Sequence, residues 1–129
     1  MITKIRENKE KSKSLMNMAE ITLKRLNNTN MEEYPTNTLL DYYGIIHQLL
    51  EAIASKDGVK ARGEGAHQEL IDYVSKKYKL TEQTRRFLQQ LRDLRNRISY
   101  EGFMVKESFI KSNKEKIEEI IENLLGELN

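Results

Sequence analysis

Residues 36–55, TNTLLDYYGIIHQLLEAIAS, carry the pattern that decides the fold. Apolar side chains recur there every three or four positions, which is the spacing of one face of an α-helix. The stripe is broad, so this segment is predicted to be a helix buried on more than one side. Thr38 and Asp41 stand in capping-box order near its start. Its apolar positions are Leu39, Tyr42, Tyr43, Ile46, Leu49, Leu50 and Ile53.

The same spacing predicts four further helices, separated by short polar links. A long one covers about residues 3–27 and ends at a run of Asn and Thr residues. Thr81 is the expected N-cap of a helix that closes at Glu101 and Gly102. The glycine-rich residues 55–65 are predicted to form a flexible loop, and no segment alternates as a strand would. The remaining helices cover about residues 66–78 and the segment from Phe109 to the C-terminus.

Five helices joined by short links predict an all-α fold, an antiparallel four- to five-helix up-and-down bundle. At 129 residues the chain has room for a single domain, residues 1–129. Its one proline leaves long helices uninterrupted. Gly44 lies inside the helix of residues 36–55, where glycine costs about 1 kcal/mol relative to alanine, so it indicates a close approach of another helix.

Composition excludes several classes of protein. With 33% charged residues and no long apolar run, the chain is not expected to span a membrane. The absence of cysteine excludes a disulfide framework, a zinc–thiolate site and a cysteine nucleophile. The N-terminal segment alternates Lys, Arg and Glu, unlike a secretory or transit peptide, so a cytoplasmic protein is expected. The two histidines lie in different predicted helices without a carboxylate at ligand spacing, so neither a metal nor a cofactor is predicted.

The net charge of +2 hides one strongly basic segment. Residues 85–97 hold five arginines opposed by Asp93 alone, which gives a local charge of +4. Guanidinium groups suit bidentate contacts to phosphate or carboxylate. The alternative is a solvated helix face that pairs with the acidic last helix, with Asp93 and Arg97 as an i,i+4 pair. The arginines are Arg85, Arg86, Arg92, Arg95 and Arg97, and the acidic residues of the last helix are Glu115, Glu118, Glu119, Glu122 and Glu127.

One side of this basic helix carries polar residues directly beside its apolar stripe. Spacings of three, four and seven place Arg92, Arg95, Asn96 and Ser99 there, and Tyr100 follows Asn96 by one helical turn. Hydrogen-bond donors of side chains beside the hydrophobic core need acceptors. A ligand phosphate, a neighbouring carboxylate or a helix carbonyl would supply them. These five residues are therefore candidate ligand-binding residues.

Three motifs stand in order along the chain. Residues 94–103, LRNRISYEGF, end the basic helix, residues 42–47 read YYGIIH, and residues 67–71 read HQELI. The first is similar to the signature of HEPN-domain proteins, the helical nucleotide-binding family of higher eukaryotes and prokaryotes. The other two resemble the aromatic and histidine-containing stretch of the family's second helix and the start of its next helix. The resemblance covers about residues 5–128.

The resemblance implies an antiparallel bundle that forms a homodimer, with the Arg-Asn motifs of two subunits facing a shared cleft. Arg95 and Asn96 match the motif of the family's ribonucleases, but Tyr100 stands where those enzymes carry histidine. A phenol, with a pKa of about 10, is a poor general base at neutral pH. The tyrosine form resembles the branch associated with minimal nucleotidyltransferases, for which nuclease activity is not implied.

His67 and His47 are the other groups that could replace the missing base. His67 begins a helix near the expected cleft and is kept as a ligand-binding candidate. A lone histidine on an apolar face is more often a hydrogen-bonded core residue, and that interpretation is favoured for both.

The sequence therefore predicts a module that binds a nucleotide or an RNA phosphate through Arg92, Arg95 and Asn96. The resemblance to HEPN-domain proteins further implies that it is the partner of a minimal nucleotidyltransferase in a two-component, toxin–antitoxin-like system. The first alternative is a metal-independent ribonuclease that acts as a dimer through Arg95, Asn96 and Tyr100. The second is a purely structural interaction protein, in which the arginines pair with the acidic residues between Glu115 and Glu122.

Overall fold

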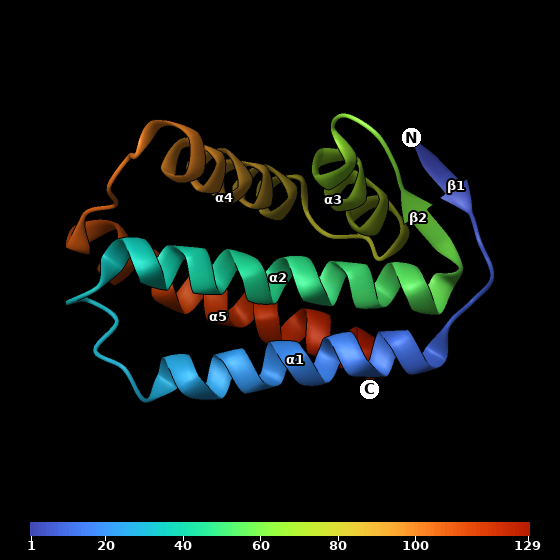
Figure 1. Cartoon of the computed structure of the whole chain (residues 1–129), viewed down its shortest axis with the longest axis horizontal. Helices are drawn as coiled ribbons and strands as arrows, with labels where there is room; N and C mark the ends of the chain where they lie inside the picture. Colours follow the sequence, from blue (N-terminus) through green and yellow to red (C-terminus); the bar gives the residue numbers. More distant parts are fainter.

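The computed structural model describes all 129 residues and consists of five helices with one small two-stranded sheet (Figure 1). The prediction of an all-helical bundle is confirmed. No helix combines the length and the apolar character that crossing a membrane requires. The elements are β1 (Ile2–Lys4), α1 (Lys9–Asn27), α2 (Pro35–Asp57), β2 (Val59–Ala61), α3 (Ala66–Lys77), α4 (Glu82–Glu101) and α5 (Glu107–Leu128).

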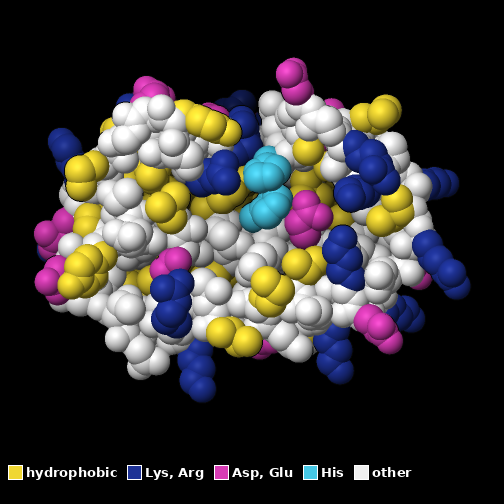
Figure 2. Space-filling model, viewed as in Figure 1, with side chains coloured by type: hydrophobic (Ala, Val, Ile, Leu, Met, Phe, Trp, Pro, Cys, Tyr) yellow, Lys and Arg dark blue, Asp and Glu magenta, His cyan; other side chains and the backbone are white.

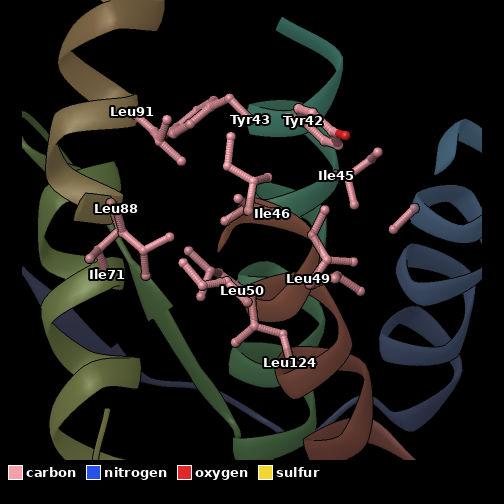
Figure 3. Close-up of a cluster of buried hydrophobic side chains, with 14 of the residues drawn as sticks. Tyr42, Tyr43, Ile45, Ile46, Leu49, Leu50, Ile71, Leu88, Leu91 and Leu124 are labelled. Carbon is pink, nitrogen blue, oxygen red and sulfur yellow. The ribbon is translucent and has the colours of Figure 1, made fainter. Parts of the chain in front are cut away.

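Helix α2 is the centre of the molecule and packs against each of the four other helices. Figure 1 shows α1 and α5 on one side of it and α3 and α4 on the other. This arrangement follows from the broad apolar stripe, because a helix buried on several sides needs apolar residues around most of its circumference. Side chains from α2, α3, α4 and α5 fill the same interior (Figure 3). The central helix thereby sets the relative positions of the four helices around it.

Three of the helix ends have capping residues of the types that favour the start or the end of a helix. The side chain of Asn8 accepts a hydrogen bond from the N–H of Lys11 at 2.9 Å, and that of Thr81 accepts one from the N–H of Thr84 at 3.1 Å. Gly102 ends α4 in the left-handed conformation, at φ 67°. The predicted N-cap at Thr81 and the predicted close of the helix at Gly102 are confirmed.

The N-terminal end of the first predicted helix is wrong, as is the prediction of no strand. Helix α1 begins at Lys9, and residues Ile2–Lys4 pair antiparallel with Val59–Ala61 inside the segment predicted to be a flexible loop. The N–H of Ile5 also donates to the carbonyl of Gly58 at 2.9 Å. Strands of three residues are too short to show a period of two, and their pairing joins distant parts of the chain. Local sequence therefore carries no signal for this sheet.

Helix α2 begins earlier than the predicted capping box. Pro35 occupies the first helical position, which suits its fixed φ and missing N–H. Thr38 is buried inside the helix, where its hydroxyl donates to the carbonyl of Met31 at 2.8 Å, and Asp41 pairs with Arg25 at 2.9 Å. The capping role predicted for Thr38 and Asp41 is therefore wrong.

The glycine that permits a close approach is Gly58, not Gly44. A Cβ atom at Gly44 would meet no atom within 4 Å, so the predicted helix contact there is wrong. A Cβ atom at Gly58 would lie 3.0 Å from the carbonyl oxygen of Ile5, and its φ of +73° is a conformation that other residues rarely adopt. Gly58 thus ends α2 and lets the segment between β1 and α1 pass against it.

A buried carboxylate fastens α3 to the C-terminal end of α2. The Asp57 side chain is 7% exposed and accepts hydrogen bonds from the hydroxyls of Tyr73, at 3.0 Å, and Tyr78, at 2.8 Å. Lys77 completes the group at 3.1 Å from the same carboxylate. A carboxylate with three donors is compensated for its loss of hydration. This group fixes where α3 lies on α2, and with it the position of the first turn of α3.

Candidate anion-binding site

A surface pocket of about 390 Å³ opens where the loop before α3, the first turn of α3 and the C-terminal half of α4 meet. Five of the six predicted ligand-binding residues line it. The sixth, Ser99, is exposed on α4 and is not part of the pocket wall. The lining residues are Gly63, Gly65, Ala66, His67, Gln68, Arg92, Arg95, Asn96 and Tyr100.

The first turn of α3 presents unpaired backbone donors to this pocket. Gly65 stands at the N-cap with φ +73° and offers no side-chain cap. The N–H groups of His67 and Gln68 have no acceptor within the chain, because the bonds of this turn are made by Ala66 and Glu69. Free N–H groups and the positive end of the helix dipole favour an anion at such a position. They add to the charge that α4 supplies from the opposite wall.

Four of the five arginines of α4 have carboxylate partners on α4 itself or on α3. The pairing with α5 is therefore wrong, as is the Asp93–Arg97 pair, because Asp93 contacts Arg92 and Arg97 contacts Glu101 instead. Most of these partners lie on α4 itself, one to four positions from their arginine, where helical spacing brings the side chains together. One partner lies on α3, which packs beside α4. The pairs are Arg85 with Glu82 at 2.6 Å and Asp72 at 3.0 Å, Arg86 with Glu82 at 3.1 Å, Arg92 with Asp93 at 2.9 Å, and Arg97 with Glu101 at 3.9 Å.

Arg95 is the exception. It is half-buried, has no carboxylate within 4 Å, and its guanidinium donates one hydrogen bond, to the amide oxygen of Asn96 at 3.2 Å. A guanidinium has five donors, so most of its hydrogen-bonding capacity remains available to a ligand. Arg92, whose side chain is 20% exposed, adds a second guanidinium to the same pocket. The two together make the pocket positively charged.

Two histidines from different helices stack against each other at this pocket. The ring centroids of His47, on α2, and His67, on α3, lie 4.1 Å apart, and Figure 2 shows the pair on one face of the molecule with basic side chains beside it. The Tyr43 hydroxyl lies 3.3 Å from Nδ1 of His67, and Nε2 of His47 lies 3.7 Å from the Glu51 carboxylate. Each histidine has a polar neighbour, as the favoured interpretation predicts, but they are partly buried and stack on each other, so neither is a lone core residue.

The electrostatic surroundings keep this pair neutral at pH 7. Burial lowers the pKa of His47 to about 4, and the charges of His67 and Arg95 act in the same direction. Burial, followed by the charge of Arg95, also lowers the pKa of His67, against a raising effect of Glu51. Burial raises the pKa of Tyr43 to about 12, although Arg92 and Arg95 oppose this rise. The pocket therefore joins charged guanidinium groups to neutral imidazoles that can accept protons.

Tyr100 is a largely exposed member of the pocket lining. It is 81% exposed, and its hydroxyl has no hydrogen-bond partner within the chain. The predicted hydrogen bond from Tyr100 to a ligand stays a prediction. The chain brings no cluster of three or more His, Asp or Glu side chains into an arrangement that would hold a metal ion.

The comparisons with known proteins add no identity to this geometry. No family model, no curated protein and no solved structure matches the chain. The resemblance to HEPN-domain proteins stays a prediction.

Proposed function

We propose that this protein is a cytoplasmic module that binds a phosphate-bearing ligand, a nucleotide or an RNA phosphate, in the pocket between α3 and α4. The single observation that carries the proposal is Arg95, a half-buried guanidinium without a carboxylate partner. A guanidinium without a carboxylate partner keeps its charge and most of its donors available, so a ligand anion can pair with it. Arg95 would hold phosphate oxygens with its planar fork of donors. Arg92, which already bonds to Gln89 and Asp93, would add its positive charge and its remaining donors.

The surrounding donors favour phosphate over a carboxylate. Two guanidinium groups and the N–H groups of His67 and Gln68 approach from opposite walls of one pocket. A carboxylate has two oxygens in a plane, whereas a phosphate group offers three or four oxygens in a tetrahedron and can use donors from both walls. Asn96 would orient a base or a ribose, and Tyr100 would donate one hydrogen bond.

Titration of the purified protein with adenosine monophosphate and with a short RNA tests this function. We expect binding of at least one of them at low salt, with affinity that falls as salt increases because bound counterions are released. A steeper salt dependence for RNA would indicate that several phosphates contact the protein. Absence of binding by both ligands at low ionic strength contradicts the proposal.

The proposal includes a homodimer and a nucleotidyltransferase partner, both of which come from the resemblance. Two large exposed side chains at the end of α4 and just after it support an interface on this part of the molecule: Tyr100, at the pocket, is 81% exposed, and Met104 is 75% exposed. Exposed apolar surface beside a polar site is typical of protein interaction surfaces. Light scattering of the purified chain measures its oligomeric state directly.

A second candidate function, metal-independent RNA cleavage, is favoured by the stacked histidines. His67 is neutral at pH 7 and lines the pocket, and its Nε2 accepts a proton in the tautomer in which Nδ1–H donates to the Tyr43 hydroxyl. It would take the proton of an RNA 2′-hydroxyl, whose oxygen attacks phosphorus. The 5′-oxygen then leaves with that proton, while the guanidinium of Arg95 stabilises the charge on the transition state. His67 thus offers the base that Tyr100 does not.

Incubation of RNA with the protein and a chelator separates the two functions. We expect a cleaving enzyme to lose at least 100-fold in rate on His67→Gln or Arg95→Ala, because each removes a group that acts in the transition state. Arg86→Ala, on an exposed arginine outside the pocket, should cleave normally. RNA that stays intact with the unaltered protein leaves binding as the function.

A further inference from the structure

The stacked histidines can carry one added proton, but a second would place two positive charges next to each other. Their ring centroids are 4.1 Å apart, so two imidazolium ions would repel each other strongly. The charged and titratable groups that face the pair are Tyr43 and Glu51 on α2 and Arg92 and Arg95 on α4. The exposed Tyr100 lines the same pocket. Two of these groups are permanent cations, and they disfavour the single proton.

An anion in the pocket reverses this balance. It would lie against the two guanidinium groups and His67, so its negative charge offsets the field that keeps the imidazoles neutral. We propose that binding of a phosphate-like dianion in this pocket is coupled to the uptake of one proton by the His47–His67 pair. The inference rests on the proposed function, because it requires that an anion binds there.

The groups around the pair can form hydrogen bonds to the protonated imidazole without rearrangement of the rings. In neutral His67 the tautomer decides whether the Tyr43 hydroxyl donates to Nδ1 or accepts from it, and in protonated His67 the Nδ1–H group donates to the hydroxyl oxygen. The other nitrogen of His67 then donates to the bound anion. On the opposite side of the stack, Glu51 lies 3.7 Å from Nε2 of His47 and favours a positive charge on the pair. The protonated state therefore has partners on both sides.

The coupling predicts the direction of a pH effect. Because the proton binds together with the anion, affinity is constant above the pKa of the anion-bound pair and rises as pH falls below it. Affinity increases by up to about tenfold per pH unit and levels off below the pKa of the free pair. By reciprocity, the anion must raise the pKa of the pair by the same factor. Because the pKa of each free histidine is below the ordinary value of 6.5, the rise in affinity is expected from about neutral pH down to about pH 5 and lower.

Sulfate is the probe for this experiment, because it is a phosphate-like dianion whose own charge does not change over that range. Calorimetric titration between about pH 5 and 8, in buffers of different ionisation enthalpy, measures both the affinity and the number of protons taken up. With two histidines in the chain, NMR resonances of the imidazole rings report their pKa with and without sulfate. We expect tighter binding at low pH, uptake of close to one proton, and an upward shift of an imidazole pKa.

Two variants make the result specific to the pair. The double variant His47→Gln, His67→Gln should bind sulfate with an affinity that no longer varies with pH, whatever its absolute value, and thermal unfolding confirms that it is folded. Arg86→Ala, outside the pocket, should keep the full pH dependence. Sulfate binding without pH dependence or proton uptake overturns the coupling and leaves the anion site standing. No sulfate binding at any pH overturns the proposed function and the coupling with it.

Discussion

Replacing Arg95 by alanine is expected to weaken phosphate binding by roughly 10- to 100-fold. Hydrogen bonds to charged groups contribute about 1.5–3 kcal/mol, and each 1.4 kcal/mol corresponds to about tenfold in affinity. Arg95 is the α4 arginine that has no carboxylate to satisfy, so its donors are free for the ligand. Fluorescence or calorimetric titration with adenosine monophosphate measures the change.

A matched control is available on the same helix. Arg86 is 76% exposed, pairs with Glu82 at 3.1 Å and lies outside the pocket, so Arg86→Ala should change the affinity by less than about twofold. It removes the same charge from the chain. Equal losses in the two variants would mean that the general positive field of α4 binds the ligand, and would contradict a specific role for Arg95.

Leu49→Ala is expected to lower the free energy of unfolding by about 2–5 kcal/mol. Leu49 is 0% exposed and belongs to the core that the central helix shares with its neighbours (Figure 3). The truncation removes buried methyl groups and leaves a cavity that a close-packed interior fills only in part. Urea denaturation followed by circular dichroism measures the loss.

The comparison for this variant is Ile21→Ala on α1. Ile21 is 69% exposed, so its truncation removes little buried surface and should change stability by less than about 0.5 kcal/mol. A similar loss at both positions would contradict the placement of α2 at the centre of the bundle.

The helices were predictable because each carries its own periodic signal. Residues 36–55 show the stripe of a helix buried on several sides, and α2 packs against all four other helices. The two strands were not predictable, since each has three residues and its partner is far away in sequence. The start of α1 was misplaced for the same reason: Ile5 continues the helical pattern but bonds to Gly58 instead.

In the candidate site, too, features within one helix were predictable, and features that depend on the packing of two helices were not. Arg92, Arg95 and Asn96 share one helix, so their spacing predicted that they lie together, and they line one pocket. The stacking of His47 on His67 depends on how α3 packs on α2, which no local pattern encodes. The ion-pair partners of the arginines were mistaken because charge composition favours α5, whereas the nearest carboxylates belong to α3 and α4.

Backbone NMR of the isotope-labelled chain during a sulfate titration tests the anion site most directly. We expect saturable shifts in the amide signals of residues 65–68 and 92–100, which form the two walls of the pocket, and little change elsewhere. A second basic hollow, lined by Lys9, Lys13 and Lys56 near the start of α1, serves as the internal comparison. Shifts concentrated at those lysines, with the pocket between α3 and α4 unchanged, would contradict the account.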